Sequence, residues 1–349
     1  MMDFLRFLFN IVLRFGLMEA LILAIALTNI FAFFLFLVDK HRAIAGKWRI
    51  SERVLVFFTL FCGIGASIAM WVLRHKTKKP KFRIVAIIGI ILAIIPIAHI
   101  IHGLTLGRMI RFVEVPFYSA NWPSELDGYR IAFMADIHML PHEDLRGAIE
   151  ELNKRNIDLL LLGGDFSTRD DHYLGSLFEI ANLATTDGIF GVEGNHDNYN
   201  RLFSAMESFG MFPLDNSGMY VREGFFVAGV SDKWNRHPSI STATRGAGEG
   251  SFVLLISHNP DIAESGRTAD IDLILAGHTH GGQIAFFGYP FYLLRGSITN
   301  YGTRFAYGFM QTNDGATMFV TSGVGVYYHV PRMFTRPEVV IFTMHHLPS

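Results

Sequence analysis

The segment Gly277-His278-Thr279-His280-Gly281-Gly282-Gln283 holds two histidines one residue apart, bracketed by glycines. It directly follows residues 271–276, an apolar run that predicts a buried strand. The glycines allow the chain to turn tightly and leave room for a close approach to the backbone. Two imidazoles on such a turn are suited to binding a metal ion. The segment therefore predicts a metal site at the end of a strand.

Four more apolar runs end in polar motifs, and these motifs supply further candidate ligands. The expected strands cover residues 129–135, 157–162, 188–192 and 252–256, and the motifs after them are D-x-H, G-G-D, G-N-H-D and S-H-N-P. Each motif alone is weak, because a single aspartate before a helix is commonly an N-cap and a single histidine there is commonly structural. Together with the first segment they supply seven candidate ligands: Asp136, His138, Asp165, Asn195, His258, His278 and His280.

Seven ligands are too many for one catalytic ion, which usually keeps about three protein ligands and an open position. Two carboxylates, one amide and four imidazoles suit two ions that share one carboxylate. Oxygen and nitrogen donors without a thiolate favour Mn, Fe or Zn. We therefore expect two divalent metal ions as cofactors.

The order of the expected elements predicts two sheets. Helical patterns over residues 143–153 and 174–184 alternate with the first three strands, which is typical of a sheet with crossover helices and a site along the strand ends. Short strands over residues 219–222, 225–230, 252–256 and 273–276 indicate a second sheet packed on the first. Residues 339–344 are expected to form the closing strand.

The ordered set of five motifs resembles the calcineurin-like metallophosphoesterase superfamily over residues 128–349, and the G-H-T-H-G-G-Q extension resembles its membrane-associated bacterial branch. The resemblance implies a four-layer αββα sandwich of two mixed sheets. It also implies an enzyme that hydrolyses phosphodiester or pyrophosphate bonds with a metal-bridging hydroxide. Some members of this branch act on lipid-linked substrates such as UDP-2,3-diacylglucosamine.

The resemblance also assigns roles to residues. It implies one ion held by Asp136, His138, Asp165 and His280, and a second held by Asp165, Asn195, His258 and His278. It implies that His196 is catalytic, faces the phosphate, and protonates the leaving group or stabilises the transferring phosphoryl oxygens. Asp197 would orient His196.

The N-terminal third has the composition of a membrane domain. Half of all residues are hydrophobic and 17% are charged, and the apolar excess lies before about residue 106. Charge-poor runs over residues 17–38, 54–73 and 84–106 predict about three transmembrane helices. The first run is too long for a signal peptide and lacks a small-residue cleavage pattern. We therefore expect an all-α membrane domain over residues 1–110 and a linker over residues 111–127, with Trp122 as an interfacial anchor.

Two strongly basic loops, residues 39–53 and 74–83, separate the three expected spans. Three spans would place the loops on opposite faces, so the positive-inside rule cannot satisfy both. The denser second loop, with Arg6 and Arg14, favours an N-terminus inside and a catalytic domain outside the cytoplasm. Residues 20–85 resemble a small bacterial membrane domain of uncharacterised function, through D-K at residue 39, G-K-W-R-I-S-E at residue 46, G-I-G-A at residue 63 and R-H-K-T at residue 74. Anchoring alone and lipid or phosphate recognition both stay open for it.

Other features bound the function. The net charge of −1 gives no reason to expect a nucleic-acid partner, and a single cysteine, Cys62, excludes a disulfide within the chain. The expected partners are a phosphoester substrate, lipid-linked in the preferred reading, and membrane lipids; the oligomeric state is not indicated. Two other classes are a membrane transport or sensing protein with an accessory phosphoesterase, and a non-catalytic binding module, against which the filled ligand set argues.

The region after the first segment carries further expectations. Residues 284–295 are unusually aromatic, and they predict either core strands of the second sheet or an apolar lip that dips into the bilayer. Arg295 and Arg304 are equally suited to binding a second phosphate and to being plain surface charges. Four histidines lack a motif and are expected not to be ligands: His237, His329, His345 and His346.

Overall fold

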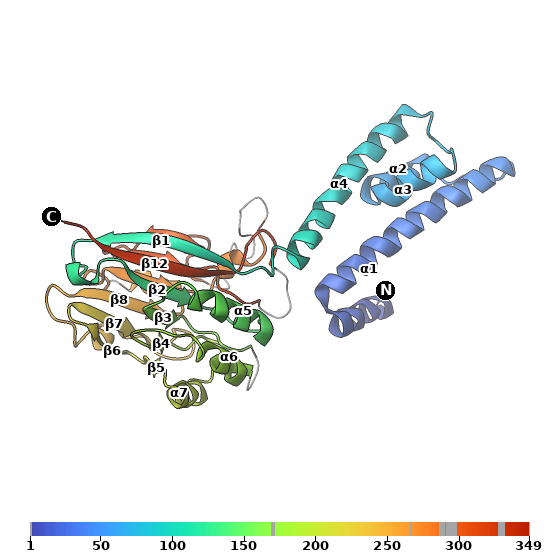
Figure 1. The fold of residues 1–349 in the computed structure, drawn as a ribbon. Helices are drawn as coiled ribbons and strands as arrows, with labels where there is room; N and C mark the ends of the chain where they lie inside the picture. Colours follow the sequence, from blue (N-terminus) through green and yellow to red (C-terminus); the bar gives the residue numbers. More distant parts are fainter. Residues whose placement is uncertain are drawn as a thin grey trace. The chain divides into compact units, whose positions relative to one another are not determined.

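The computed structural model describes residues 2–168, 172–265, 267–285, 290, 299–326 and 332–348, with the backbone only at residues 2–21, 96, 100, 104 and 172. The chain forms two compact units, Met1–Leu104 and Thr105–Ser349 (Figure 1). The first unit is all helical, and the second contains all of the described strands.

The N-terminal unit consists of helices α1 (Met2–Ile44), α2 (Glu52–Phe61), α3 (Gly63–Val72) and α4 (Pro80–Leu104). Among the described residues, two segments are long and apolar enough to cross a membrane, Ile22–Ile44 and Pro80–Gly103. Fewer than one fifth of the residues in these segments are buried, whereas the core helix of a soluble protein buries most of its surface. The two segments indicate association with a membrane.

The second of the three expected spans, over residues 54–73, is not confirmed, because this run is broken at Cys62. The backbone there leaves the helical region, with φ −122° and ψ 49°, and separates α2 from α3. Each helix has ten residues, or about 15 Å at 1.5 Å per residue. This is about half the roughly 30 Å thickness of a bilayer core.

The second unit is built on two six-stranded mixed sheets. The first has the order β1-β12-β2-β3-β4-β5 and the second the order β10-β11-β9-β8-β7-β6. The strands of the first sheet are β1 (Arg111–Ser119), β2 (Tyr129–Met134), β3 (Leu159–Leu162), β4 (Ile189–Gly191), β5 (Phe212–Pro213) and β12 (Glu338–His346). Those of the second are β6 (Ser217–Arg222), β7 (Phe225–Gly229), β8 (Phe252–Ser257), β9 (Leu273–Ala276), β10 (Gly308–Gln311) and β11 (Thr317–Val320). The predicted pair of mixed sheets is confirmed.

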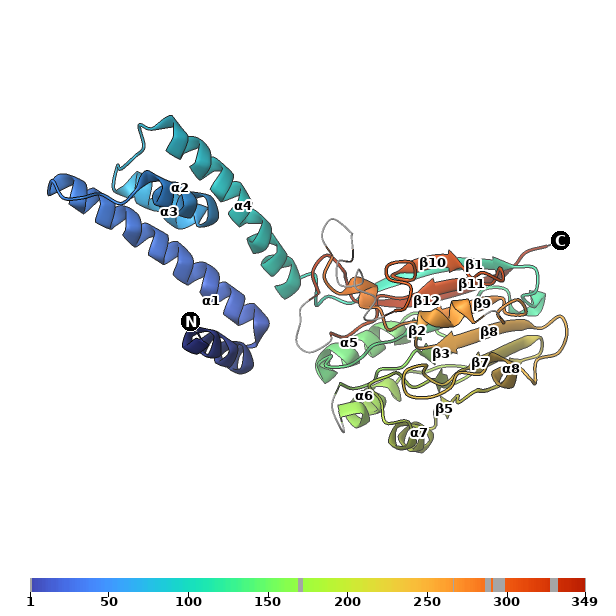
Figure 2. The ribbon, with the colours of Figure 1, turned by 180° about the vertical axis from the view of Figure 1, so that it is seen from behind.

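Helices cover the outer faces of both sheets (Figures 1 and 2). The helices α5 (His142–Asn153), α6 (His172–Ile180) and α7 (Tyr199–Ser208) lie against the first sheet. Shorter helices, α8 (Ile240–Ala243) and η2 (Pro260–Glu264), pack on the second. Alternation along β2 shows the layering, because Ile131 and Phe133 face the core between the sheets whereas Ala132 and Met134 face the helices.

The predicted linker over residues 111–127 is wrong in its first part. Residues 111–119 form strand β1, which pairs in parallel with β12 at the edge of the first sheet. The expectation that Trp122 is an interfacial anchor is also wrong, since its side chain is fully buried. Its ring lies 4.8 Å from that of Phe225 and 5.0 Å from that of Phe252, so Trp122 closes one end of the core between the sheets.

We predict that Trp122→Ala strongly destabilises the second unit. Removing a buried tryptophan costs about 3–5 kcal/mol in free energy of unfolding, and its Nε1 hydrogen bond to the Leu126 carbonyl, 2.9 Å long, is lost as well. Calorimetry of the detergent-solubilised chain should show a melting temperature lower by roughly 10 °C. Trp48→Ala is the matched control, because Trp48 is 94% exposed. Equal melting temperatures for the two variants would contradict the burial of Trp122.

Candidate metal centre

The motifs come together because the strands that precede them run in parallel. Strands β2, β3 and β4 are parallel neighbours in the first sheet, and β8 and β9 are parallel neighbours in the second. The carboxyl ends of parallel strands meet at one edge of a sheet. Five predicted ligands have left-handed backbone conformations, with φ between 43° and 74°: Asp136, His138, Asp165, His278 and His280. Such conformations are strained for residues other than glycine and persist where the surroundings impose them.

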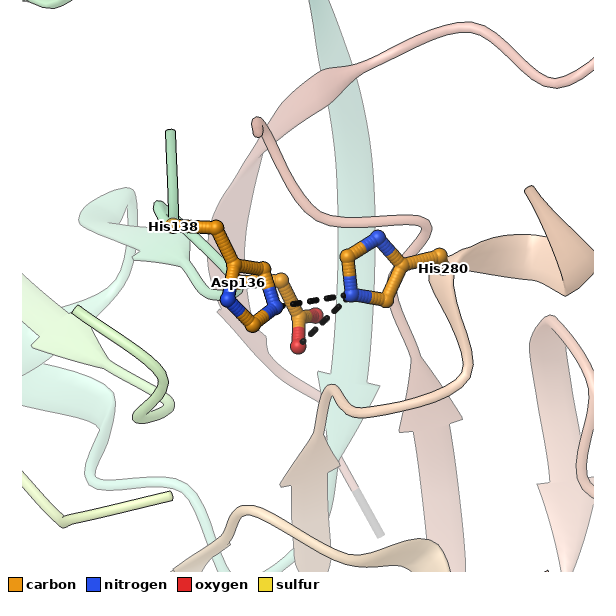
Figure 3. Close-up of side chains that lie close together, drawn as sticks. All are labelled: Asp136, His138 and His280. Atoms are coloured by element: carbon orange, nitrogen blue, oxygen red, sulfur yellow. Dashed lines mark hydrogen bonds and ion pairs between the residues drawn. The ribbon is translucent and has the colours of Figure 1, made fainter. Parts of the chain in front are cut away.

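Asp136, His138 and His280 form a first group of possible ligands, shown in Figure 3. All three side chains are buried. The Nε2 atom of His138 lies 3.0 Å from Nε2 of His280, which in turn lies 3.6 Å from Oδ1 of Asp136. These atoms point at one another, so they can surround a single ion.

Asp165, His258 and His278 form a second group, and Asn195 joins it. Nε2 of His258 lies 3.2 Å from Oδ2 of Asp165, 3.1 Å from Oδ1 of Asn195 and 3.2 Å from Nδ1 of His278. His278 thus turns its Nδ1 atom toward the group, whereas the other three histidines turn Nε2. Within the described residues, this is the second of two such clusters.

Asp165 lies between the two groups. The same oxygen, Oδ2, is 3.4 Å from Nε2 of His138 in the first group and 3.2 Å from Nε2 of His258 in the second. Its other oxygen accepts a hydrogen bond from the backbone N–H of His196 at 2.9 Å. The geometry therefore matches the shared carboxylate that the count of ligands predicts.

Burial dominates the electrostatics of both groups. It raises the pKa of Asp136 to about 7 and lowers the pKa of His138 to about 4. Burial also acts to raise the pKa of Asp165, but the charges of His258 and His138 outweigh it and hold that pKa well below its usual range. The negative charge of Asp165 adds to the rise in the pKa of Asp136. Positive ions between the groups would stabilise both carboxylates, so the donor set fits a pair of divalent cations.

Polar contacts behind the histidines orient them. His258 donates from Nδ1 to the Gly163 carbonyl at 2.7 Å, so its Nε2 faces the site as the atom available to a metal ion. Nδ1 of His138 lies 3.1 Å from the hydroxyl of Thr168. Arg332 is fully buried and donates to the backbone carbonyls of Gly325 at 2.8 Å and His280 at 3.3 Å. It therefore holds the turn that carries His280.

The two predicted catalytic residues follow β4, next to Asn195. The ring of His196 lies 5.5 Å from that of His138, at the edge of the first group. Asp197 is partly buried and accepts hydrogen bonds from the backbone N–H groups of Gly194 and Asp165 at 2.8 Å and of Phe166 at 2.9 Å. Burial and the Asp165 charge raise the pKa of Asp197 to about 8. These bonds give Asp197 a role in joining the loops after β3 and β4, which the sequence did not predict.

Several residues of the site escaped the sequence analysis. Thr168 and Arg332 have no motif, and Arg332 meets a turn 52 residues away in the chain. The loop after β7 carries two more: Asn235 donates to the Asn195 carbonyl at 2.8 Å, and the Trp234 ring lies 6.4 Å from that of His278. This loop, residues 231–250, is polar and contains glycines, a composition that fits a position near the site but identifies neither residue.

The remaining expectations concern residues away from the two groups. Arg304 binds Glu264 at 2.6 Å, as a plain surface charge does. His345 stacks on Tyr118, and His346 contacts the Trp122 carbonyl at 2.6 Å. Most of the aromatic run over residues 284–295, including Arg295, and also His329 lie outside the described residues.

We predict that Thr168→Val weakens metal binding by about 10- to 100-fold, as loss of a partner behind a ligating histidine typically does. Valine keeps the shape of threonine but cannot bond Nδ1 of His138. The concentration of Mn²⁺ that gives half-maximal hydrolysis measures the effect. Thr168→Ser keeps the hydroxyl and should behave as the unchanged protein. Equal Mn²⁺ dependence of the two variants would remove Thr168 from the site.

Comparison with known proteins identifies the family. The calcineurin-like phosphoesterase family matches residues 129–282. The phosphodiesterase YaeI of Escherichia coli (strain K12) is 30% identical over 235 residues, which cover 62% of this chain and 82% of that protein. The chain belongs to the calcineurin-like phosphoesterase family. The predicted family is thereby confirmed, and we call residues 105–349 the phosphoesterase domain.

Other relatives extend the comparison. An uncharacterized metallophosphoesterase of Helicobacter pylori (strain ATCC 700392 / 26695) is 28% identical over 242 residues, covering 66% of this chain and 62% of that protein. A transmembrane protein with metallophosphoesterase domain from Danio rerio is 25% identical over 315 residues, covering 82% of this chain and 69% of that protein. A family of proteins of unknown function, DUF1294, matches residues 29–82 in the N-terminal unit. The phosphoesterase domain is thus joined to a second recognisable family.

Proposed function

We propose that this chain is a membrane-anchored phosphoesterase that uses two divalent metal ions to hydrolyse phosphodiester or pyrophosphate bonds. The observation that carries the proposal is the position of Asp165, whose Oδ2 lies within 3.4 Å of a ligand atom in each group. The donor set favours Mn, Fe or Zn. The two apolar segments of the N-terminal unit supply the anchor.

Each residue of the site has a task in this proposal. Asp136, His138 and His280 hold one ion, and Asn195, His258 and His278 hold the other, with Asp165 shared. When bound, the ions would supply a water activated near neutral pH and positive charge against the phosphate oxygens. His196, at the rim of the first group, protonates the leaving oxygen or stabilises the transferring phosphoryl group. Asp197 keeps the loops of Asp165 and Asn195 in register and in this way positions His196.

The substrate class follows from the anchor. A phosphoesterase tethered to a bilayer meets lipid-linked and envelope phosphoesters at high local concentration, and we propose these as substrates. UDP-2,3-diacylglucosamine is one such compound, in which a pyrophosphate joins a nucleoside to a lipid.

Metal analysis combined with an activity assay tests the proposal. The purified chain should carry transition metal and hydrolyse bis(4-nitrophenyl) phosphate, a generic aryl phosphodiester. A chelator should abolish hydrolysis, and Mn²⁺ should restore it. A chain that carries no transition metal and stays inactive after addition of Mn²⁺ would refute the proposed function.

A further inference from the structure

The two basic loops of the N-terminal unit meet around one buried carboxylate. Asp39, at the first loop, is fully buried. Arg49 of the same loop donates to its Oδ2 at 2.7 Å, and Nε2 of His75 in the second loop lies 2.8 Å from that oxygen. Lys76 of the second loop lies 2.8 Å from Glu52. Residues 39–53 and 74–83 therefore lie at the same end of the helices, and not on opposite faces as three spans would require.

The short helices α2 and α3 account for this arrangement. Helix α2 runs from the first basic loop into the helical unit, and α3 returns from there to the second basic loop. The backbone N–H of Gly65, at the start of α3, donates to the side chain of Asn29 at 2.8 Å. Asn29 lies ten residues before Asp39 in α1, or about 15 Å along the helix axis. On the other side Gly63 lies against Gly89, nine residues into α4, so close that a Cβ on Gly63 would be 2.1 Å from the Gly89 carbonyl carbon. Measured along either α1 or α4, the turn at Cys62 therefore lies about halfway through a bilayer core of roughly 30 Å.

A turn at that depth is stable only where protein covers its polar backbone, since lipid offers no hydrogen bonds. The Cys62 N–H donates to the Phe58 carbonyl at 2.8 Å, and the Cys62 carbonyl accepts from Ala66 at 3.1 Å. The side chain of Cys62 is 5% exposed. Figures 1 and 2 show α2 and α3 side by side between α1 and α4 at one end of this unit.

Positive charge is concentrated at that end. Residues 39–53 hold five lysines and arginines and residues 74–83 hold six, against two acidic residues in both loops together. At the other end residues 1–21 hold two arginines and residues 105–110 hold one. Most of the loop cations are exposed to solvent: Arg42, Lys47, Arg49, Arg53, Arg74, Lys78, Lys79, Lys81 and Arg83. Short loops rich in lysine and arginine stay in the cytoplasm, where anionic lipids attract them.

We propose that α2 and α3 form a re-entrant hairpin, that the two basic loops bind the anionic headgroups of the cytoplasmic leaflet, and that the phosphoesterase domain lies on the outer face of the membrane. The chain then crosses the bilayer twice, through α1 and α4. An even number of crossings puts Ile22, at the start of the apolar segment of α1, and Leu104, at the end of α4, on the face opposite to the loops. Both basic loops then lie on the cytoplasmic face, so the positive-inside rule is satisfied for both. The expected position of the phosphoesterase domain outside the cytoplasm is kept, with two crossings in place of three.

This inference rests on the proposed function in one respect, because it narrows the substrate. A phosphoesterase domain on the outer face reaches phosphoesters of envelope lipids and polymers. It does not reach nucleotide-linked lipids that face the cytoplasm, such as UDP-2,3-diacylglucosamine. The outer face therefore selects envelope phosphodiesters as the substrate class.

Cysteine labelling of the full chain tests the topology. Cys62→Ala removes the only cysteine, and single cysteines are then introduced by Lys47→Cys in the first loop, Lys78→Cys in the second and Glu249→Cys in the phosphoesterase domain. In spheroplasts a membrane-impermeant maleimide should label the Glu249→Cys variant at once. The Lys47→Cys and Lys78→Cys variants should label only after the membrane is permeabilised.

Each of the other labelling outcomes would overturn a specific part of the proposed topology. Labelling of the two loop variants from opposite sides would show that α2 and α3 cross the membrane. Labelling of both loops, and not of residue 249, in intact spheroplasts would reverse the orientation, and labelling of all three would remove the membrane crossing. Hydrolysis of bis(4-nitrophenyl) phosphate by the same variants in detergent does not depend on the face, so it separates failure of the topology from failure of the proposed function.

Discussion

Asp165→Asn should abolish hydrolysis and release metal from both groups. The carboxylate lies within 3.4 Å of ligand atoms in both clusters, through a single oxygen. Asparagine has nearly the same shape but no charge, so both ions would lose a negative ligand in a buried site. We expect turnover to fall by on the order of a thousandfold or more, since loss of one electrostatic partner of the transition state already costs roughly 100- to 1,000-fold.

The measurements are metal content by mass spectrometry and turnover of bis(4-nitrophenyl) phosphate. Asp272→Asn is the matched control. Asp272 is a partly buried aspartate that accepts a backbone N–H from Val253 at 2.8 Å, and it precedes β9, at the end of the strand away from His278. The control should keep both its metal and its activity. An Asp165→Asn chain with full metal content and near-native turnover would refute a shared ligand.

His196→Ala should separate catalysis from metal binding. The backbone N–H of His196 donates to Asp165 at 2.9 Å, and alanine keeps that bond, so the ligand groups stay in place. Loss of a general acid costs about 100- to 10,000-fold in turnover. We therefore expect full metal content with turnover reduced by that factor.

The dependence on the leaving group distinguishes a general acid from a structural residue. An alkyl leaving group needs a proton more than 4-nitrophenolate does, so the His196→Ala variant should lose more activity on an alkyl phosphodiester than on the nitrophenyl ester. His237→Ala, which removes an exposed histidine, should leave both rates unchanged. Equal losses on the two substrates would assign His196 to binding and not to proton transfer.

Local sequence patterns were sufficient to predict the strands that surround the site. Each strand of the centre is a short apolar run buried on both faces, as at Leu159–Leu162, and each run ends in a motif whose residue types identify a ligand. Because parallel strands bring their carboxyl ends to one edge, the motifs were expected to lie close together. The family resemblance, and not the order of the strands, predicted which side chains share an ion. Contacts between distant segments left no such pattern. The approach of Arg332 to His280 and of Thr168 to His138 depends on how loops from distant parts of the chain pack against one another.

The N-terminal unit shows where apolar composition is ambiguous. The run over residues 54–73 is as apolar as a membrane span, and hydropathy does not show whether it crosses a bilayer or turns back within it. The turn at Cys62 depends on Asn29 and Gly89, which lie in other helices. The same holds for residues 111–119, whose mixed polarity suits a linker and an edge strand equally well until β12 pairs with them.

The sequence by itself determined the phosphoesterase family, the two sheets and the seven candidate ligands, because each of these depends on residue types at fixed spacing along the chain. The tertiary structure alone decided three further matters. It placed one oxygen of Asp165 between the two groups, it supplied the residues that hold the histidines from behind, and it brought the basic loops to one end of the helices. All three depend on distances between segments far apart in the chain, which no local pattern encodes.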